Sequence, residues 1–187
     1  MYLDSTALLL IPALLLALIA QGRIKAAYSK YGKVPVASRV TGAEAAQRML
    51  RDQGNDAVRI QPVRGQLTDH YDPRNETLSL SEEVYGSASV AAVGIAAHEV
   101  GHAMQKRDDY APLGLRSMVV PAVSIGSGLS MPIFVLGLIM SWRPLLYAGI
   151  ALFSLTVLFS LITLPVEFNA SRRAMTMLQT SGIITSQ

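Results

Sequence analysis

The sequence predicts a mainly α-helical membrane protein, in which three transmembrane helices carry one small α+β domain. Hydrophobic residues make up 51% of the 187 residues and charged residues only 16%, whereas a soluble domain carries about 25% charged residues. The charges gather in one segment, residues 23–116, and long charge-free stretches lie on both sides of it. This polar segment has the length of one small domain.

The same composition excludes several classes of protein. The net charge of +3, from 16 Lys and Arg against 13 Asp and Glu, is too small for a protein that coats nucleic acid, so we expect no nucleic-acid partner. The chain has no Cys, which excludes a disulfide scaffold, a thiol nucleophile and a Cys-ligated metal site. Any chemistry that needs imidazole therefore depends on the 3 histidines, His70, His98 and His102.

Three charge-free stretches match the length of about 20 residues that an apolar helix needs to cross a bilayer. They are residues 5–22, 117–142 and 144–166. The first has neither the basic start nor the small-residue cleavage site of a signal peptide, so we expect residues 1–22 to be a retained anchor rather than a cleaved leader. Only Arg143 separates the other two stretches, which predicts a transmembrane hairpin over residues 117–166.

The distribution of Lys and Arg predicts the orientation of these spans, because short loops rich in Lys and Arg stay in the cytoplasm. Basic residues flank the spans on one side: Arg23, Lys25, Lys30, Lys33, Arg116, Arg172 and Arg173. Arg143 alone lies on the opposite side. We therefore expect the N-terminus outside, and residues 23–116 and the C-terminal segment 167–187 in the cytoplasm.

Local patterns predict the elements of the polar segment. Thr41 and Glu44 fit a capping box that opens a helix, and Gly54 is suited to end it. Turn-forming residues 72–75 lie between two short runs that alternate, which predicts a hairpin. In chain order, the predicted elements are a helix over 43–53, a strand over 58–63, hairpin strands over 66–71 and 77–80, and a core helix from about residue 87.

The last of these helices contains His98-Glu99-Val100-Gly101-His102, an H-E-x-x-H motif. Residues four apart lie on one face of a helix, so both imidazoles can bind a single Zn²⁺, with Glu99 placed to take a proton from bound water. A Glu in an Ala-rich apolar helix is costly unless it is paired or engaged with a metal. We therefore expect His98 and His102 to be metal ligands and Glu99 to be the catalytic general base.

A catalytic zinc ion usually takes a third protein ligand, which must be His, Asp or Glu in a chain without Cys. The candidates are His70, Asp108, Asp109 and Glu167. Glu167 is the only acidic residue after Asp109, and the predicted hairpin returns it to the side on which the H-E-x-x-H helix lies. We favour Glu167, although a Glu at this place also fits the interfacial end of a transmembrane helix.

Several stretches together resemble the bacterial neutral zinc metallopeptidases of the YugP-like type: VGIAAHEVGHAMQ, the hairpin, LPVEFNASRRA, TGAEAAQRMLRDQG and LTDHYDPRNETLSLS. The resemblance covers nearly the whole chain. It implies a zincin-like cytoplasmic domain of the gluzincin kind, zinc ligands His98, His102 and Glu167, Glu99 as general base, and the bacterial inner membrane as location. Ser171 stands where the wider membrane-protease pattern has Asp, and it can accept a hydrogen bond from a ligand histidine. Members continue with a further apolar segment, which implies a chain truncated after Gln187.

The predicted function is a zinc-dependent metalloendopeptidase in the lipid bilayer, which hydrolyses membrane or membrane-associated proteins through a zinc-activated water. Candidates for stabilising the oxyanion are His70, Arg173, Tyr71 and Tyr110, with His70 and Arg173 favoured. His70 equally fits a turn residue that bonds its own hairpin. The strand over 66–71 can pair with an extended peptide substrate. A homo-oligomer or a partner membrane protein is compatible with the sequence.

Other classes of membrane protein fit less well. An intramembrane protease would need an Asp ligand in a later span, and no Asp follows Asp109. A transporter would need ionisable residues within its spans, and residues 117–142 and 144–166 have none. The alternative that stays open is a non-catalytic membrane adaptor or chaperone with a structural zinc site, which four protein ligands would close.

Overall fold

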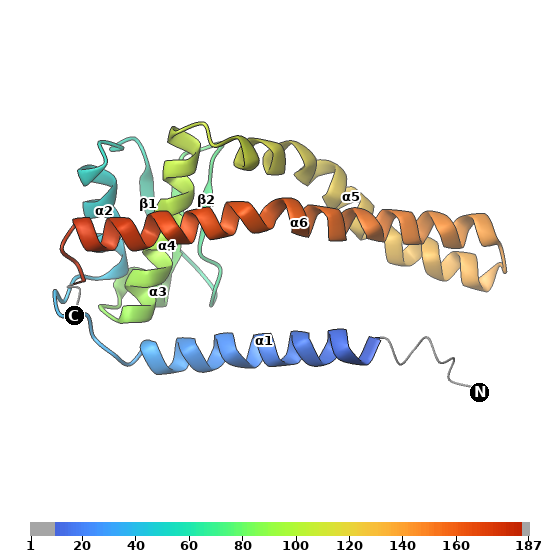
Figure 1. The fold of residues 1–187 in the computed structure, drawn as a ribbon, viewed down its shortest axis with the longest axis horizontal. Helices are drawn as coiled ribbons and strands as arrows, with labels where there is room; N and C mark the ends of the chain where they lie inside the picture. Colours follow the sequence, from blue (N-terminus) through green and yellow to red (C-terminus); the bar gives the residue numbers. More distant parts are fainter. Residues whose placement is uncertain (1–9, 185–187) are drawn as a thin grey trace.

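The computed structural model describes residues 10–184, in which three long helices extend from one end of a small α+β part (Figure 1). The long helices are α1 (Leu10–Tyr31), α5 (Ala111–Ile139) and α6 (Arg143–Thr180), and each is long and apolar enough to cross a membrane. The predicted fold class, mainly α with three spans and a small α+β part, is confirmed. Residues 1–9 of the predicted anchor and the predicted truncation point at Gln187 lie outside the described residues.

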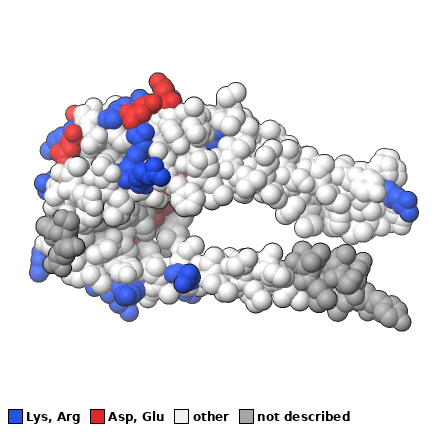
Figure 2. All heavy atoms as spheres, viewed as in Figure 1, with Lys and Arg blue, Asp and Glu red and all other residues white. Residues whose placement is uncertain are grey.

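Charged side chains gather at the end of the molecule that holds the sheet, whereas the stretches of the long helices beyond this end are almost free of them (Figure 2). A small group of basic atoms marks the far tip of the hairpin, where α6 begins at Arg143. The large apolar side chains of α1, α5 and α6 are widely exposed, for example Leu16 at 67% and Ile139 at 75%. Such exposure suits hydrocarbon rather than water, because it leaves a large apolar area uncovered.

The sheet has three short strands: β1 (Arg59–Val63), β2 (His70–Asp72) and β3 (Thr77–Ser81). β3 lies in the middle, antiparallel to β2 and parallel to β1. The predicted hairpin is confirmed, but its first strand is shorter than the expected 66–71. The reason is local, because Gly65 and Leu67 have φ angles of 111° and 55°, which an extended strand cannot accommodate. In the strand order β1-β3-β2, β2 lies at one edge of the sheet.

Three shorter helices complete the α+β part: α2 (Gly42–Asp52), α3 (Glu82–Gly86) and α4 (Val90–Arg107). The capping box is confirmed, since Thr41 Oγ1 accepts from the Glu44 N–H at 3.2 Å and Glu44 Oε2 accepts from the Thr41 N–H at 2.8 Å. The patterns in the sequence did not predict α3. One core joins α2, β3, α4 and the end of α6, and its large members include Met49, Leu50, Leu78, Leu80, Val93, Met104 and Met177.

The long helices do not stop where the hydropathy changes. α1 continues past the predicted end of the anchor at residue 22, because Ala26 and Ala27 favour a helix and the first turn signal is Gly32. α6 runs without a break through the predicted boundary between residues 166 and 167. Backbone hydrogen bonds form equally well in hydrocarbon and in a protein core, so a change of environment need not end a helix.

α4 and α6 cross in backbone contact at Gly101. A Cβ added to Gly101 would lie 2.4 Å from the carbonyl oxygen of Ala170. No residue other than glycine therefore fits at this point of the crossing. The crossing holds the hairpin of α5 and α6, called the membrane hairpin below, against the α+β part.

We predict that Gly101→Ala separates α4 from α6 and lowers stability by about 1–3 kcal/mol, the range for overpacking a close contact. Gly94→Ala is the matched control on the same helix, because a Cβ there meets no atom within 4 Å. The control should raise stability by up to about 1 kcal/mol through helix propensity. Thermal unfolding of both variants in detergent measures the difference, and equal midpoints would contradict the close crossing.

Candidate metal centre

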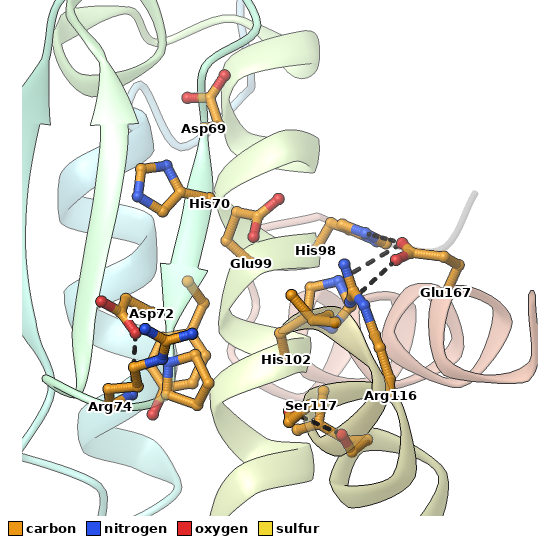
Figure 3. A pocket seen from close by; sticks show the side chains of 14 residues that line it. Asp69, His70, Asp72, Arg74, His98, Glu99, His102, Arg116, Ser117 and Glu167 are labelled. Carbon is orange, nitrogen blue, oxygen red and sulfur yellow. Dashed lines mark hydrogen bonds and ion pairs between the residues drawn. The ribbon is translucent and has the colours of Figure 1, made fainter. Parts of the chain in front are cut away.

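Two helices bring three metal-binding side chains to one point beside their crossing. α4 carries His98 and His102 on one face, and α6 carries Glu167 opposite them (Figure 3). The Glu167 Oε2 atom lies 3.1 Å from His98 Nε2 and 3.5 Å from His102 Nε2. One donor atom from each residue falls within 4.8 Å of the other two, so a single ion can reach all three.

The hydrogen bonds of Gln105 determine which nitrogen of His102 is free. Gln105 is fully buried, and its Nε2 donates to the Val166 carbonyl at 2.8 Å and to Asn169 Oδ1 at 3.0 Å. The amide oxygen of Gln105, which can only accept, lies 2.9 Å from His102 Nδ1. Nδ1 of His102 must therefore carry the proton, which leaves the Nε2 lone pair directed at the cluster. This is the orienting arrangement of a metal-binding imidazole.

Ser171 gives His98 a similar partner. Its Oγ lies 3.1 Å from His98 Nδ1, one turn of α6 beyond Glu167. A hydroxyl that accepts this N–H leaves the Nε2 of His98 for a ligand, although Ser171 adds no negative charge. The two imidazoles meet edge to face, with ring centroids 4.8 Å apart. Two imidazole nitrogens and a carboxylate oxygen, all oriented by their neighbours, fit a zinc ion.

Glu99 lies next to the cluster and is 9% exposed. Burial raises the pKa of its carboxyl group above the ordinary value, while the nearby His102 and His98 act in the opposite direction. A carboxylate with a raised pKa is a better proton acceptor than a carboxylate in water. The position and the environment of Glu99 therefore suit proton transfer.

The cluster opens into a cavity of about 560 Å³, which α4, α5, α6 and the edge strand β2 enclose. Arg116, at the start of α5, lines it and lies with Nη1 3.4 Å from Glu167 Oε1. The sequence indicated Arg116 only as a marker of orientation. The predicted hairpin already brought residues 116 and 167 to the same side, but their ion pair depends on side-chain positions that no local pattern reveals.

The other residues that the sequence suggested lie in different places. His70 and Tyr71 line the cavity from β2, and His70 Nδ1 is 2.8 Å from the Thr68 carbonyl oxygen, as in a turn. Arg173 donates from Nε to Asn169 Oδ1 at 2.9 Å and pairs with Asp108, and the residues that line the cavity do not include it. Tyr110 precedes α5 as its N-cap, next to a different pocket.

A His-His-Glu donor set beside three apolar helices defines a membrane-bound metalloprotein. The sequence model of a family described as "Putative neutral zinc metallopeptidase" matches residues 6–187, and the chain belongs to this family. A relative from Bacillus subtilis (strain 168), described as "Putative membrane protease YugP", is 46% identical over 176 residues, which cover 94% of this chain and 78% of the relative. No solved structure matches the chain. The family's metal is zinc, in agreement with the donor set.

We predict that Gln105→Met, which keeps the volume but removes the hydrogen bonds, weakens zinc binding about 10–100-fold, the usual cost of losing a partner that orients a ligand histidine. Gln47→Met on the exposed face of α2 is the control and should bind zinc like the parent protein. Titration of metal-free protein against a zinc chelator of known affinity measures both variants. Unchanged zinc affinity in Gln105→Met would show that His102 needs no such partner.

Proposed function

We propose that this protein is a membrane-anchored zinc endopeptidase, with His98, His102 and Glu167 as zinc ligands and Glu99 as general base. The observation that carries the proposal is the arrangement of these four side chains around one cavity, where two helices cross. Three residues that can bind a metal ion lie together in the described part of the chain. Catalytic zinc sites have three protein ligands and an open position, whereas structural sites are closed by four. This count favours an enzyme over the alternative, an adaptor or chaperone with a structural zinc site.

The side chains around the cavity have different roles in the proposed mechanism. Zinc, when bound, supplies the Lewis acidity that activates water and polarises a peptide carbonyl. Glu99 accepts the proton of the attacking water and delivers it to the leaving amine, because it lines the cavity next to the proposed ligands. Arg116 holds Glu167 by charge and points a guanidinium into the cavity, where it can stabilise a developing oxyanion. We propose Arg116 rather than Arg173 for that role, because Arg116 lines the cavity whereas Arg173 lies outside it and pairs with Asp108.

The edge strand β2 supports binding of an extended peptide. It contributes three residues to the wall of the cavity, and only one of its sides pairs with β3. A substrate backbone can add to the free side as a further strand. Membrane proteins or segments close to the membrane are the proposed substrates, since the cluster lies where α6 leaves its apolar stretch.

The proposed location is the bacterial inner membrane, with the metal centre on the cytoplasmic side. The positive-inside rule supports this orientation, because basic residues flank the spans on the side of the metal centre. Arg143, at the far tip of the hairpin, is the single charged residue between positions 117 and 166.

We predict that Glu99→Gln retains zinc but loses peptide hydrolysis by about 10²–10⁴-fold, the usual contribution of a positioned general base. The purified protein in detergent is incubated with a proteome-derived peptide library, and the products are identified by mass spectrometry. Zinc content is measured on the same samples. Products formed at the parental rate by Glu99→Gln would reject the proposed mechanism.

We also predict that Glu167→Ala loses most of the bound zinc, because it removes the anionic ligand. Glu82→Ala changes an exposed Glu on α3 and should keep the parental zinc content. Elemental analysis after dialysis compares the two variants. Full zinc occupancy in Glu167→Ala would assign the third ligand to another residue.

The orientation can be tested with single cysteines, since the chain has none of its own. We expect Arg143→Cys to react with a membrane-impermeant thiol reagent in intact spheroplasts, and Asp56→Cys to react only after lysis. The reverse pattern would place the metal centre outside the cytoplasm.

A further inference from the structure

A second cavity, of about 640 Å³, lies along the same face of α4 as the cavity described above, towards the N-terminal end of this helix. The two cavities adjoin, because His98, Glu99 and Asp69 line both of them. A polypeptide that extends from one cavity into the other therefore passes His98 and Glu99. This continuity connects the second cavity with the proposed reaction site.

The two cavities differ sharply in chemistry. The second is lined mainly by apolar and small residues of α4 and α6: Ala91, Gly94, Ile95, Ala174, Met175 and Leu178. None of the described residues that line it is Lys or Arg. The first cavity, in contrast, has Asp72, Arg74, Arg116 and Glu167 on its walls. Apolar side chains are favoured in the second cavity, and polar or charged side chains are favoured in the first.

The second cavity also faces the membrane helices. α1 closes one side with Ile24, Tyr28 and Tyr31. Towards the membrane, residues 11–27 of α1 are exposed, and open space separates α1 from the hairpin of α5 and α6 (Figure 2). An apolar segment that lies in the bilayer can reach the cavity through this space without crossing the charged end of the molecule.

We propose that the second cavity is a specificity pocket for large apolar side chains on one side of the scissile bond, so that the enzyme cleaves where an apolar membrane segment passes into a polar one. This inference rests on the proposed peptidase function. The apolar part of the substrate lies in the second cavity, its backbone passes Glu99, and its polar part lies along β2 in the first cavity. A lipid chain would fill the apolar cavity but would make no use of the polar one.

Gly94 offers a way to fill the pocket without disturbing the fold. A Cβ at Gly94 meets no atom within 4 Å, and the residue lies on the wall of the second cavity. Gly94→Leu therefore projects a side chain into the pocket while it improves the helix propensity of α4. Gly128→Leu is the matched control, because Gly128 is exposed on α5, has the same free space, and lines neither cavity.

The first experiment profiles cleavage of the peptide library by the parent protein and by both Leu variants. We expect Leu, Ile, Met and Phe to be enriched on one side of the bonds that the parent cleaves. Gly94→Leu should lower cleavage of these sites about 10-fold or more relative to sites with Ala or Ser there, the discrimination that a few methylene groups give. Gly128→Leu should keep the parental profile. A parent without apolar preference, or an unchanged profile in Gly94→Leu, would overturn the pocket while leaving the peptidase function intact.

A second experiment measures binding and does not depend on hydrolysis. A peptide with one photoreactive leucine is crosslinked to the Glu99→Gln protein, and the labelled residues are mapped by mass spectrometry. We expect labels on Ile95, Met175 or Leu178, and loss of these labels in the protein that also carries Gly94→Leu. Labels elsewhere would overturn the pocket, as would a photoreactive fatty acid that labels it in preference to the peptide. If the pocket is labelled but no peptide is cleaved, the peptide site stands and the proposed catalytic function fails.

Discussion

The close crossing of α4 and α6 is the contact on which the metal centre depends. Two rows of residues spaced four apart meet there, Ala97, Gly101 and Gln105 on α4 and Val166, Ala170 and Ala174 on α6, and all are buried. Rows with this spacing interdigitate when two helices pack closely. Each donor residue follows a packed residue by one position, so that His98, His102 and Glu167 line the edge of the contact. The backbone approach at Gly101 thereby sets the distance between the histidines and the carboxylate.

The membrane hairpin contributes to the centre from both of its ends. Arg116 comes from the start of α5 and Glu167 from α6, where that helix leaves its apolar stretch, and the two side chains form an ion pair beside the histidines. Gln105 on α4 donates hydrogen bonds to the Val166 carbonyl and to Asn169 Oδ1 on α6. Gln105 is fully buried, and these hydrogen bonds offset the cost of burying its amide between the helices. The long apolar helices α5 and α6 are thus a component of the site.

Local signals predicted much of the fold, because they depend on neighbouring residues. The capping box at Thr41, the turn before β3 and the four-residue spacing of His98 and His102 are all visible within a few positions of the chain. The charge-free stretches predicted three spans, since hydropathy depends on composition. The short helix α3 and the true length of β2 were not predicted, because backbone angles such as the positive φ of Leu67 leave no clear pattern.

The site was predictable only in part for a related reason. The H-E-x-x-H motif is local, and the scarcity of acidic residues after Asp109 favoured Glu167 as the third ligand. The roles of Arg116, Gln105 and Gly101 depend on contacts between segments about 50 or more residues apart. Such contacts follow from the three-dimensional path of the chain. Arg173 was favoured, with His70, for stabilising the oxyanion, but tertiary contacts direct its guanidinium to Asp108.

The unbroken course of α6 has a geometric consequence for the depth in the bilayer at which the proposed reaction takes place. From Arg143 at the hairpin tip to Glu167, a straight helix rises about 36 Å at about 1.5 Å per residue. The hydrocarbon layer of a bilayer is about 30 Å thick. When the hairpin tip lies at one surface of the bilayer, the length of α6 places the Glu167 carboxylate among the lipid headgroups of the other surface. The distance of a substrate's peptide bond from the hydrocarbon layer then decides whether that bond can reach the metal centre. A thicker bilayer or a more tilted helix would change this distance.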